Sequence, residues 1–248
     1  MSNPFPRTTV AGVSLSRMII GTNWILGYSH TTAAADESIK SRNCGTDAIA
    51  DILEAFLESG VDTIMVEMRG RRTMRDALKR TEDRTGKRIV RIDTPVINVD
   101  DTPAARREAE AAIAESARNG ATFCLPHHSS VEQLVLKNSR AIPRLPDYLC
   151  AGFLMQVEIE YVHSIIWSAR KPVMTIKPMA AGRVSPFVGL TFAFATIREC
   201  DMVTVGCLTP QEAREDIEIG LAALDRRPPR LAGRGSVHTT PIMAKVVS

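Results

Sequence analysis

Side chains that can bind ligands or move protons follow several short apolar runs in this sequence, each near the point where the run ends. Glu67 follows one run, Asp93 lies near the end of the next, His127 and His128 come just after a third, and Lys177 follows a fourth. If these runs are parallel strands of one sheet, their carboxyl ends lie at the edge where such folds keep their chemistry. The sequence therefore predicts that these side chains converge on one cavity.

The residue types at these positions are compatible with several kinds of chemistry. Two carboxylates and an imidazole would suit a divalent metal, although their spacing matches no metal-binding motif. Adjacent strand residues point to opposite faces, so one of His127 and His128 is expected to face the cavity, as a ligand or as a loop-packing residue. Lys177 could form an ion pair, face a phosphate, or act as a desolvated amine that forms a Schiff base. The candidate catalytic residues are thus Glu67, His127, His128 and Lys177, with a metal left open.

The elements that must position these residues follow a repeating pattern of apolar run and helix. The expected strands cover residues 17–21, 61–66, 88–96, 121–125, 173–176 and 202–205, and the expected helices cover residues 47–59, 73–85, 102–118, 158–170, 185–198 and 210–225. A small hairpin is expected over residues 8–16, a long loop over 28–43, and a short helix starting at Ser129 or Ser130. Repeats of about 30 residues with this pattern indicate βα units and a parallel sheet.

Counting these units predicts the fold class, an α/β protein built as a (β/α)8 barrel of the TIM type. Residues 140–158 have room for at most one more strand, so the barrel is expected to be shortened or incomplete around its fifth and sixth βα units. A chain of 248 residues fits one such domain, and residues from about 226 onward are expected to form a tail.

Composition narrows the class of partner. The formal net charge of +3 is small for this length, and basic residues alternate with acidic ones, which argues against nucleic acid. No apolar stretch has the length of about 20 residues that a bilayer requires, and the first residues lack the apolar core of a signal peptide. We therefore expect a cytoplasmic protein with a small-molecule substrate and no membrane partner, and a homo-oligomer stays open. The five cysteines lack paired spacing and are expected to be free, buried thiols.

Two stretches near the end of the chain resemble a known family. The sequences KPMAAG at 177–182 and VGCLTPQE at 205–212 look like the seventh and eighth βα units of the aldo-keto reductases. The resemblance implies that the first turn cradles the pyrophosphate of NAD or NADP and that the second unit holds the adenosine half. The cofactor-binding residues it implies are Lys177, Met179, Ala180, Ala181, Gly182, Arg183, Gly206, Thr209, Gln211 and Asp216.

The first expected strand ends in Thr22, Asn23 and Trp24, which are expected to form the substrate pocket. Tyr28 could wall the same pocket, whereas Tyr161 and Trp167 lie on an expected helix and are assigned to the core.

The catalytic half departs from the family pattern. The family places an Asp at the end of its second strand, a Tyr acid soon after it, and a Lys at the end of its third strand. Here the second run ends in Met65, Val66 and Glu67, no Tyr lies between 62 and 147, and Thr94 follows the third run. Only the family's His has a counterpart, in His127 or His128. Without Tyr and Lys the usual general acid is missing. Leu208 stands where a basic residue would meet a 2′-phosphate.

The function expected from these observations is that of an aldo-keto-reductase-like oxidoreductase, or a degenerate relative, which binds a nicotinamide dinucleotide at the carboxyl ends of the strands. Two alternatives use the same face of the barrel. One is a metal-dependent or Schiff-base lyase or hydrolase, and the other is a non-catalytic barrel that binds a phosphorylated ligand.

Overall fold

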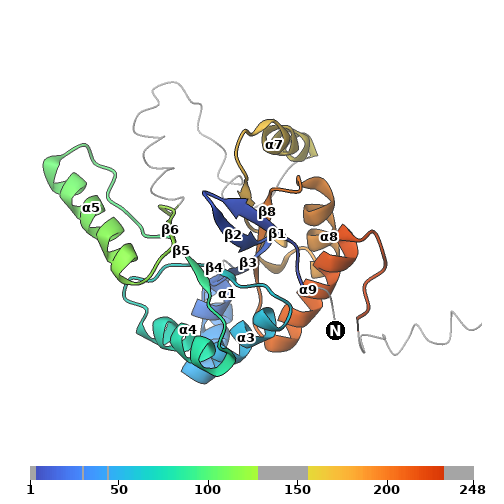
Figure 1. The fold of residues 1–248 in the computed structure, drawn as a ribbon, viewed down its shortest axis with the longest axis horizontal. Coiled ribbons are helices and arrows are strands. Elements are labelled where there is room, and N and C mark those ends of the chain that lie inside the picture. Colours follow the sequence, from blue (N-terminus) through green and yellow to red (C-terminus); the bar gives the residue numbers. More distant parts are fainter. Residues whose placement is uncertain (1–3, 30, 44, 128–155, 232–248) are drawn as a thin grey trace, which may run out of the picture.

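A computed structural model of the chain describes residues 4–29, 31–43, 45–127 and 156–231. Within them a parallel sheet of six strands curls into a half-barrel, in the order β6-β5-β4-β3-β8-β7 (Figure 1). The strands are β3 (Met18–Gly21), β4 (Thr63–Val66), β5 (Val90–Asp93), β6 (Phe123–Cys124), β7 (Met174–Thr175) and β8 (Met202–Gly206). The predicted α/β class and the incomplete TIM-type barrel are confirmed.

The strand register brings the carboxyl ends together at one edge of the sheet. Gly21 of β3 pairs with Met65 of β4 on one side and with Gly206 of β8 on the other. Val66 of β4 pairs with Asp93 of β5. The residues that follow these strands are therefore neighbours in space, although they lie far apart in the sequence.

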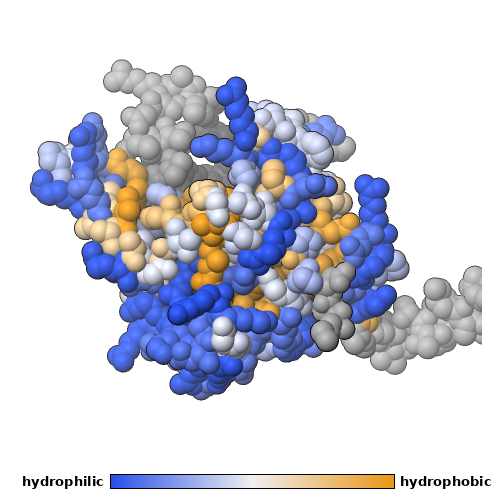
Figure 2. Space-filling view, in the orientation of Figure 1, coloured by the Kyte–Doolittle hydropathy of each residue, from blue (hydrophilic) through white to orange (hydrophobic). Residues whose placement is uncertain are grey.

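Helices cover the outer face of the half-barrel. They are α3 (Thr46–Glu58), α4 (Arg72–Thr85), α5 (Pro103–Arg118), α7 (Gln156–Ser168), α8 (Pro186–Thr196) and α9 (Pro210–Leu224). Helix α8 packs on α9, α9 on α3, and α3 on α4. The start of α5 follows from local sequence, because the Thr102 hydroxyl accepts a hydrogen bond from the Ala105 amide and Pro103 occupies the first turn. Figure 2 shows a largely hydrophilic surface in the region of α4, where α3 and α4 exchange ion pairs such as Arg84–Asp51.

Two apolar clusters fill the two sides of the sheet. On the outer side, Ile20 and Val205 pack under the helices, while on the inner side Ile19 and Met202 pack with Leu15. Leu15 belongs to the antiparallel hairpin of β1 (Arg7–Val10) and β2 (Val13–Ser16). The hairpin therefore packs against the inner face of the half-barrel and supports the strands from within.

The prediction of a long loop over residues 28–43 is wrong for the second part of that segment. Residues Ala33–Arg42 form α2, whose Thr32 cap accepts a hydrogen bond from the Ala35 amide. Only Ile39 of this helix is buried, so the sequence carries no apolar stripe that would reveal it. Before it, α1 (Asn23–Leu26) adds one helical turn directly after β3. The helix predicted from Ser129 or Ser130 lies outside the described residues.

The predicted burial of two aromatic side chains and of the cysteines is also corrected. Tyr161 and Trp167 on α7 are 65% and 55% exposed, because α7 lies beside the edge strand β7 and no element in the described part of the chain covers its outer side. Cys207 is buried, but Cys124 is exposed. The remaining cysteines are Cys200, which is half-buried, and Cys44 and Cys150, which lie outside the described ranges. None of the described helices is long and apolar enough to cross a membrane.

Candidate functional site

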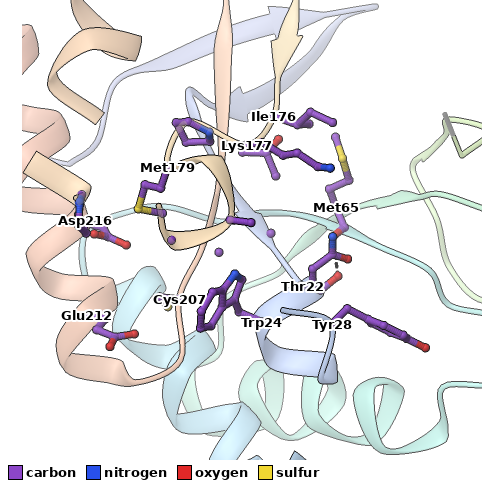
Figure 3. A pocket seen from close by; sticks show the side chains of 18 of the residues that line it. Thr22, Trp24, Tyr28, Met65, Ile176, Lys177, Met179, Cys207, Glu212 and Asp216 are labelled. Atoms are coloured by element: carbon purple, nitrogen blue, oxygen red, sulfur yellow. Dashed lines mark hydrogen bonds between the residues drawn. The ribbon is translucent and has the colours of Figure 1, made fainter. Parts of the chain in front are cut away.

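A cavity of about 440 Å3 opens at the carboxyl ends of the strands (Figure 3). Its floor comes from strand ends and the residues that follow them, including Gly21, Met65, Thr94 and Thr204. Its walls come from α1, from the turn after β7 and from the first turns of α9. The cavity therefore lies where α/β barrels carry their sites, and its volume is in the range of small-molecule pockets.

Most of the residues predicted for the site line this cavity. Of the candidate catalytic residues, Glu67, His127 and Lys177 line it, and His128 lies outside the described residues. The pocket residues Thr22, Asn23 and Trp24 all line it. Of the expected cofactor residues, Met179, Ala181, Gly182, Gly206 and Asp216 line the cavity, whereas Ala180, Arg183, Thr209 and Gln211 do not.

The turn after β7 has an unusual backbone. Lys177, Ala180 and Ala181 have φ values of 58°, 47° and 56°, a left-handed region that L side chains enter at a cost. The turn contains a short 3-10 helix, η2 (Ala180–Gly182). The Ala180 amide donates a hydrogen bond to the Lys177 carbonyl, and the Gly182 amide donates one to the Met179 carbonyl. These two amides are thus already used within the turn. In this conformation neither amide is available to a phosphate.

Trp24 forms an inner wall of the cavity and lies against two glycines. A Cβ atom on Gly182 would lie 3.4 Å from the indole Cζ2, and one on Gly206 would lie 3.6 Å from the indole Cδ1. Gly182 also has a φ of 81°, which a side chain would strain. Both distances are ordinary van der Waals contacts, so the positive φ of Gly182, and not a lack of space, is what favours glycine there.

The charges of the cavity are divided between its two sides. Figure 3 shows Lys177 on one side and Glu212 and Asp216 of α9 on the other, with Trp24 between them. The Glu212 carboxylate accepts a hydrogen bond from the Leu208 amide at 2.7 Å, while the Thr209 hydroxyl accepts one from the Glu212 amide at 3.1 Å. These two bonds fix the start of α9 in the manner of a capping box, except that Glu212 accepts from the residue before the cap.

Cys207 lies beside these carboxylates and is not a nucleophile in this setting. Burial raises the pKa of its thiol well above the ordinary value, and the nearby carboxylates of Asp216 and Glu212 raise it further. A thiol in this state carries almost no thiolate at neutral pH.

The structure also reveals a cluster around Arg71 that the sequence did not predict. The Arg71 guanidinium donates hydrogen bonds to the Tyr28 hydroxyl at 2.6 Å and to the Glu67 carboxylate at 3.0 Å, and it lies 5.3 Å from the centre of the Tyr28 ring. Burial lowers the pKa of Arg71, but the bonds to Tyr28 and Glu67 outweigh it and raise the pKa overall. Figure 3 shows the Tyr28 hydroxyl pointing away from Trp24, so the ring forms wall and the hydroxyl serves Arg71. The four-residue spacing of Glu67 and Arg71 was the only signal in the sequence.

Asp93 does not join the other strand-end residues. Its carboxylate accepts a hydrogen bond from the Met68 amide at 2.8 Å and is 2% exposed, so it braces the loop after β4. The expected convergence of Asp93 with Glu67 and His127 is therefore wrong, because the two carboxylates serve different neighbours. The described residues contain no group of three or more His, Cys, Asp or Glu side chains that could hold a metal ion.

Comparisons with known proteins show which solved structures have a similar fold. No protein-family profile and no curated protein matches the sequence. Two solved structures from Pseudomonas aeruginosa, each described as a "putative aldo-keto reductase", are similar in fold. One is 17% identical, with a TM-score of 0.54 over 86% of this chain and 93% of its own. The other is 16% identical, with a TM-score of 0.56 over 90% of this chain and 97% of its own. This chain therefore has an aldo-keto-reductase-like fold.

Proposed function

We propose that this chain binds a nicotinamide dinucleotide in the cavity at the strand ends, as an aldo-keto-reductase-like oxidoreductase or a degenerate relative of one. The observation that carries the proposal is that the turn after β7 and the first turns of α9, the two stretches that resemble the family, together wall one cavity. The aldo-keto-reductase-like fold supports the same interpretation.

The residues present fit such a ligand in part. Lys177 is the cation that would neutralise a pyrophosphate, and Trp24 offers a ring face to a planar group. Glu215 and Asp216 would accept hydrogen bonds from the hydroxyl and amino groups of adenosine. Thr204 lines the cavity, and its buried hydroxyl, which has no partner within the described ranges, suits a polar ligand group. The Ala180 and Gly182 amides would have to leave the turn to contribute.

The same carboxylates bear on the choice between the two dinucleotides. Glu212, Glu215 and Asp216 all line the α9 side of the cavity. A 2′-phosphate placed there would be repelled, whereas a ribose diol would find acceptors. We therefore expect NAD(H) to bind more tightly than NADP(H).

The chemistry of the site depends on which side chain moves a proton. A bound nicotinamide would supply or accept hydride. His127 and Lys177 line the cavity and could donate a proton to a developing alkoxide, and Glu67 could accept one. Because the Tyr28 hydroxyl serves Arg71, we expect His127, whose imidazole can carry a proton to the substrate, to be the proton donor. Substituting His127 by Gln should then abolish turnover while leaving dinucleotide affinity nearly unchanged.

Binding is tested by titrating the protein with NADH, NADPH and inorganic phosphate while tryptophan fluorescence is recorded. Trp24 lines the cavity and Trp167 lies on α7 outside it, so the variant Trp167→Phe isolates the signal from the cavity. The proposal requires a saturable change with NADH in that variant. If Trp24→Phe loses the fluorescence change but still binds NADH by calorimetry, the fluorescence change comes from Trp24.

Two variants test the contacts. Lys177→Met removes a charge-assisted contact worth about 1.5–3 kcal/mol, so the dinucleotide affinity should fall by about tenfold or more. Gly182→Val should weaken binding by as much, through steric pressure on Trp24 and the strained φ. Lys171→Met is the matched control, because Lys171 is exposed and does not line the cavity. Equal binding by all variants, or none by the unaltered protein, would refute the dinucleotide proposal.

The alternative functions predict other outcomes of the same experiments. Binding of inorganic phosphate without any binding of NADH would favour a barrel that binds a phosphorylated ligand. A product of borohydride reduction at Lys177, detected by mass spectrometry with a carbonyl compound, would favour Schiff-base chemistry.

A further inference from the structure

A second cavity, of about 280 Å3, lies at the start of α4. Its lining includes Lys40, Asn43, Arg71 and Arg72, together with Thr73 and Met74 in the first turn of α4. We propose that this cavity, named here the α4 pocket, binds a small oxyanion of the phosphate or sulfate class. The inference does not depend on the proposed dinucleotide function.

The first argument is the uncapped start of α4. Residue Arg71 occupies the cap position, and its side chain accepts no hydrogen bond from the first turn of the helix. The first hydrogen bond of the helix runs from the Arg75 amide to the Arg71 carbonyl. The amides of Arg72, Thr73 and Met74 therefore have no acceptor within the described chain, unlike the amides that Thr209 and Ser185 cap in α9 and α8. An anion at the amino end of a helix satisfies such donors and the helix dipole together.

The second argument is independent of the helix and comes from buried side-chain donors. Asn43 is 9% exposed and lines the α4 pocket, and its buried Nδ2 atom has no hydrogen-bond partner among the described residues. Arg71 lines the same pocket, and its buried Nε atom likewise has no partner in the described part of the chain. Buried N–H groups are nearly always paired. Two such donors beside an uncapped helix start indicate that the missing partner is an acceptor with several oxygens.

The charges that line the α4 pocket have one sign. The titratable residues among its lining are Lys40, Arg71 and Arg72, and no carboxylate contributes to it. Each cation has an acidic neighbour outside the lining: Glu37 lies 2.8 Å from Lys40, Glu67 lies 3.0 Å from Arg71, and Asp76 lies 3.7 Å from Arg72. These acidic partners reduce the positive potential inside the pocket, but they lie outside the lining and supply no acceptor there. The lining therefore selects an anion over a cation.

The size and surroundings of the pocket limit the ligand. A volume of about 280 Å3 is below the usual range for pockets that hold drug-sized ligands, so it suits one tetrahedral anion or a single phosphoryl group. The apolar side chains of Ile25, Leu26 and Ile49 complete the lining and exclude water from part of it. Leu26 also lines the main cavity, and Arg71 holds Tyr28 and Glu67 there. The two cavities thus share a wall at Leu26 but are lined by different charged residues.

The test is a titration of the isotopically labelled, full-length protein with inorganic phosphate, followed by amide NMR at constant ionic strength. We expect saturable shifts at the amides of Arg72, Thr73 and Met74 and at the side-chain amide of Asn43. A parallel titration with glycerol 3-phosphate distinguishes a free anion from a phosphoryl group on a small molecule, and saturable shifts with either ligand support the site. The variant Lys177→Met should keep these shifts, which separates the α4 pocket from the main cavity.

Two variants and one control make the result decisive. Asn43→Asp keeps the shape of the side chain and replaces its buried donor with a carboxylate, so phosphate affinity should fall by tenfold or more. Arg72→Met alters a side chain that is 88% exposed, should fold normally, and should weaken binding about threefold or more. Lys79→Met removes the same charge from an exposed position of α4 outside the pocket and should leave the affinity unchanged.

Three outcomes would overturn the inference. The first is the absence of saturable shifts in the first turn of α4. The second is unchanged affinity in Arg72→Met together with unchanged affinity in Asn43→Asp. The third is an equal loss in Lys79→Met, which would mean that phosphate responds only to the net charge of the helix.

Discussion

Replacing Asp201 with Asn should destabilise the half-barrel at its β7 edge. The two oxygens of the Asp201 carboxylate are completely buried and accept hydrogen bonds from four N–H groups, and Oδ1 also accepts a weak one from the Cys200 thiol at 3.6 Å. Oδ1 accepts from the Val173 amide at 2.9 Å and from Nη2 of Arg198 at 2.7 Å. Oδ2 accepts from the Arg198 amide at 3.0 Å and from its Nε at 2.9 Å. Because Val173 leads into β7, this carboxylate fixes the strand that precedes Lys177 and its turn.

The size of the effect follows from these contacts. The substitution leaves one oxygen acceptor and places an NH2 group against two N–H donors, so two of the four bonds from N–H groups are lost. Hydrogen bonds to charged groups contribute roughly 1.5–3 kcal/mol each, and breaking a buried ion pair by removing one partner costs roughly 3–5 kcal/mol. We expect Asp201→Asn to lower the free energy of unfolding by about 3–5 kcal/mol at pH 7, a large share of the roughly 5–15 kcal/mol typical of native proteins.

The acid dependence of this loss has a definite sign. Burial raises the pKa of Asp201, but the hydrogen bonds from Arg198 and from the Val173 amide outweigh it and lower the pKa overall. A carboxyl group with a lowered folded-state pKa stabilises the protein above its unfolded pKa, about 3.9, and that contribution disappears as the pH falls through the folded value. The difference between the unaltered protein and Asp201→Asn should therefore be largest near pH 7 and shrink below about pH 4.

Urea unfolding followed by circular dichroism, at pH 7 and at a series of lower pH values, measures both effects. The control is Asp225→Asn, because Asp225 pairs with Arg227 at 3.2 Å but has a side chain that is 61% exposed, and such pairs contribute at most about 1 kcal/mol. A loss below 1 kcal/mol in Asp201→Asn, or a difference that grows as the pH falls, would refute the assigned role of this carboxylate.

Three further predictions concern the turn after β7, the capping of α9 and the cysteines. Ala181→Gly should raise the free energy of unfolding by up to about 1 kcal/mol, because Ala181 has a φ of 56°. The control Ala111→Gly, within α5, should lower the free energy of unfolding by about 1 kcal/mol. Thermal unfolding of both variants tests whether the two effects have opposite signs. Thr209→Ala should cost about 1 kcal/mol in the same assay, since its hydroxyl caps α9, and no loss would mean that the cap is replaced by solvent. Thiol labelling at pH 8 should modify exposed Cys124 much faster than Cys207, whose pKa is raised by burial; rapid labelling of Cys207 in folded protein would contradict its burial.

The sequence predicted those parts of the fold that depend on local signals. The apolar runs before Glu67 and Lys177 correspond to strands, and the Thr-Pro pairs at Thr102 and Thr209 start helices where expected. Caps and strand ends are specified by residues a few positions apart, so they can be read without the tertiary structure. The shortened barrel followed from counting these units.

The parts that could not be predicted depend on distant partners. Asp93 points to the Met68 amide and not to the cavity, which no spacing in the sequence reveals. Helix α2 buries a single large apolar side chain, Ile39, and thus lacks a periodic signal. The role of Arg71 required three-dimensional proximity to Tyr28, a residue far away in the chain. The resemblance implied that the turn after β7 cradles a pyrophosphate, but which of its amides are available depends on local geometry that composition does not fix.

The pairing of β3 with β8 has a consequence for how the chain folds as it is synthesised. Residues Met18–Gly21 pair with residues 203–206, so a central strand acquires one of its two neighbours only when nearly the whole described chain has left the ribosome. Until then β3 exposes unpaired backbone along one side, which is the kind of edge that pairs with other chains. Contacts so distant in sequence also slow folding. Fragments released before β8 should therefore depend on chaperones to remain unaggregated, and the sheet should become resistant to proteolysis only after β8 has been made.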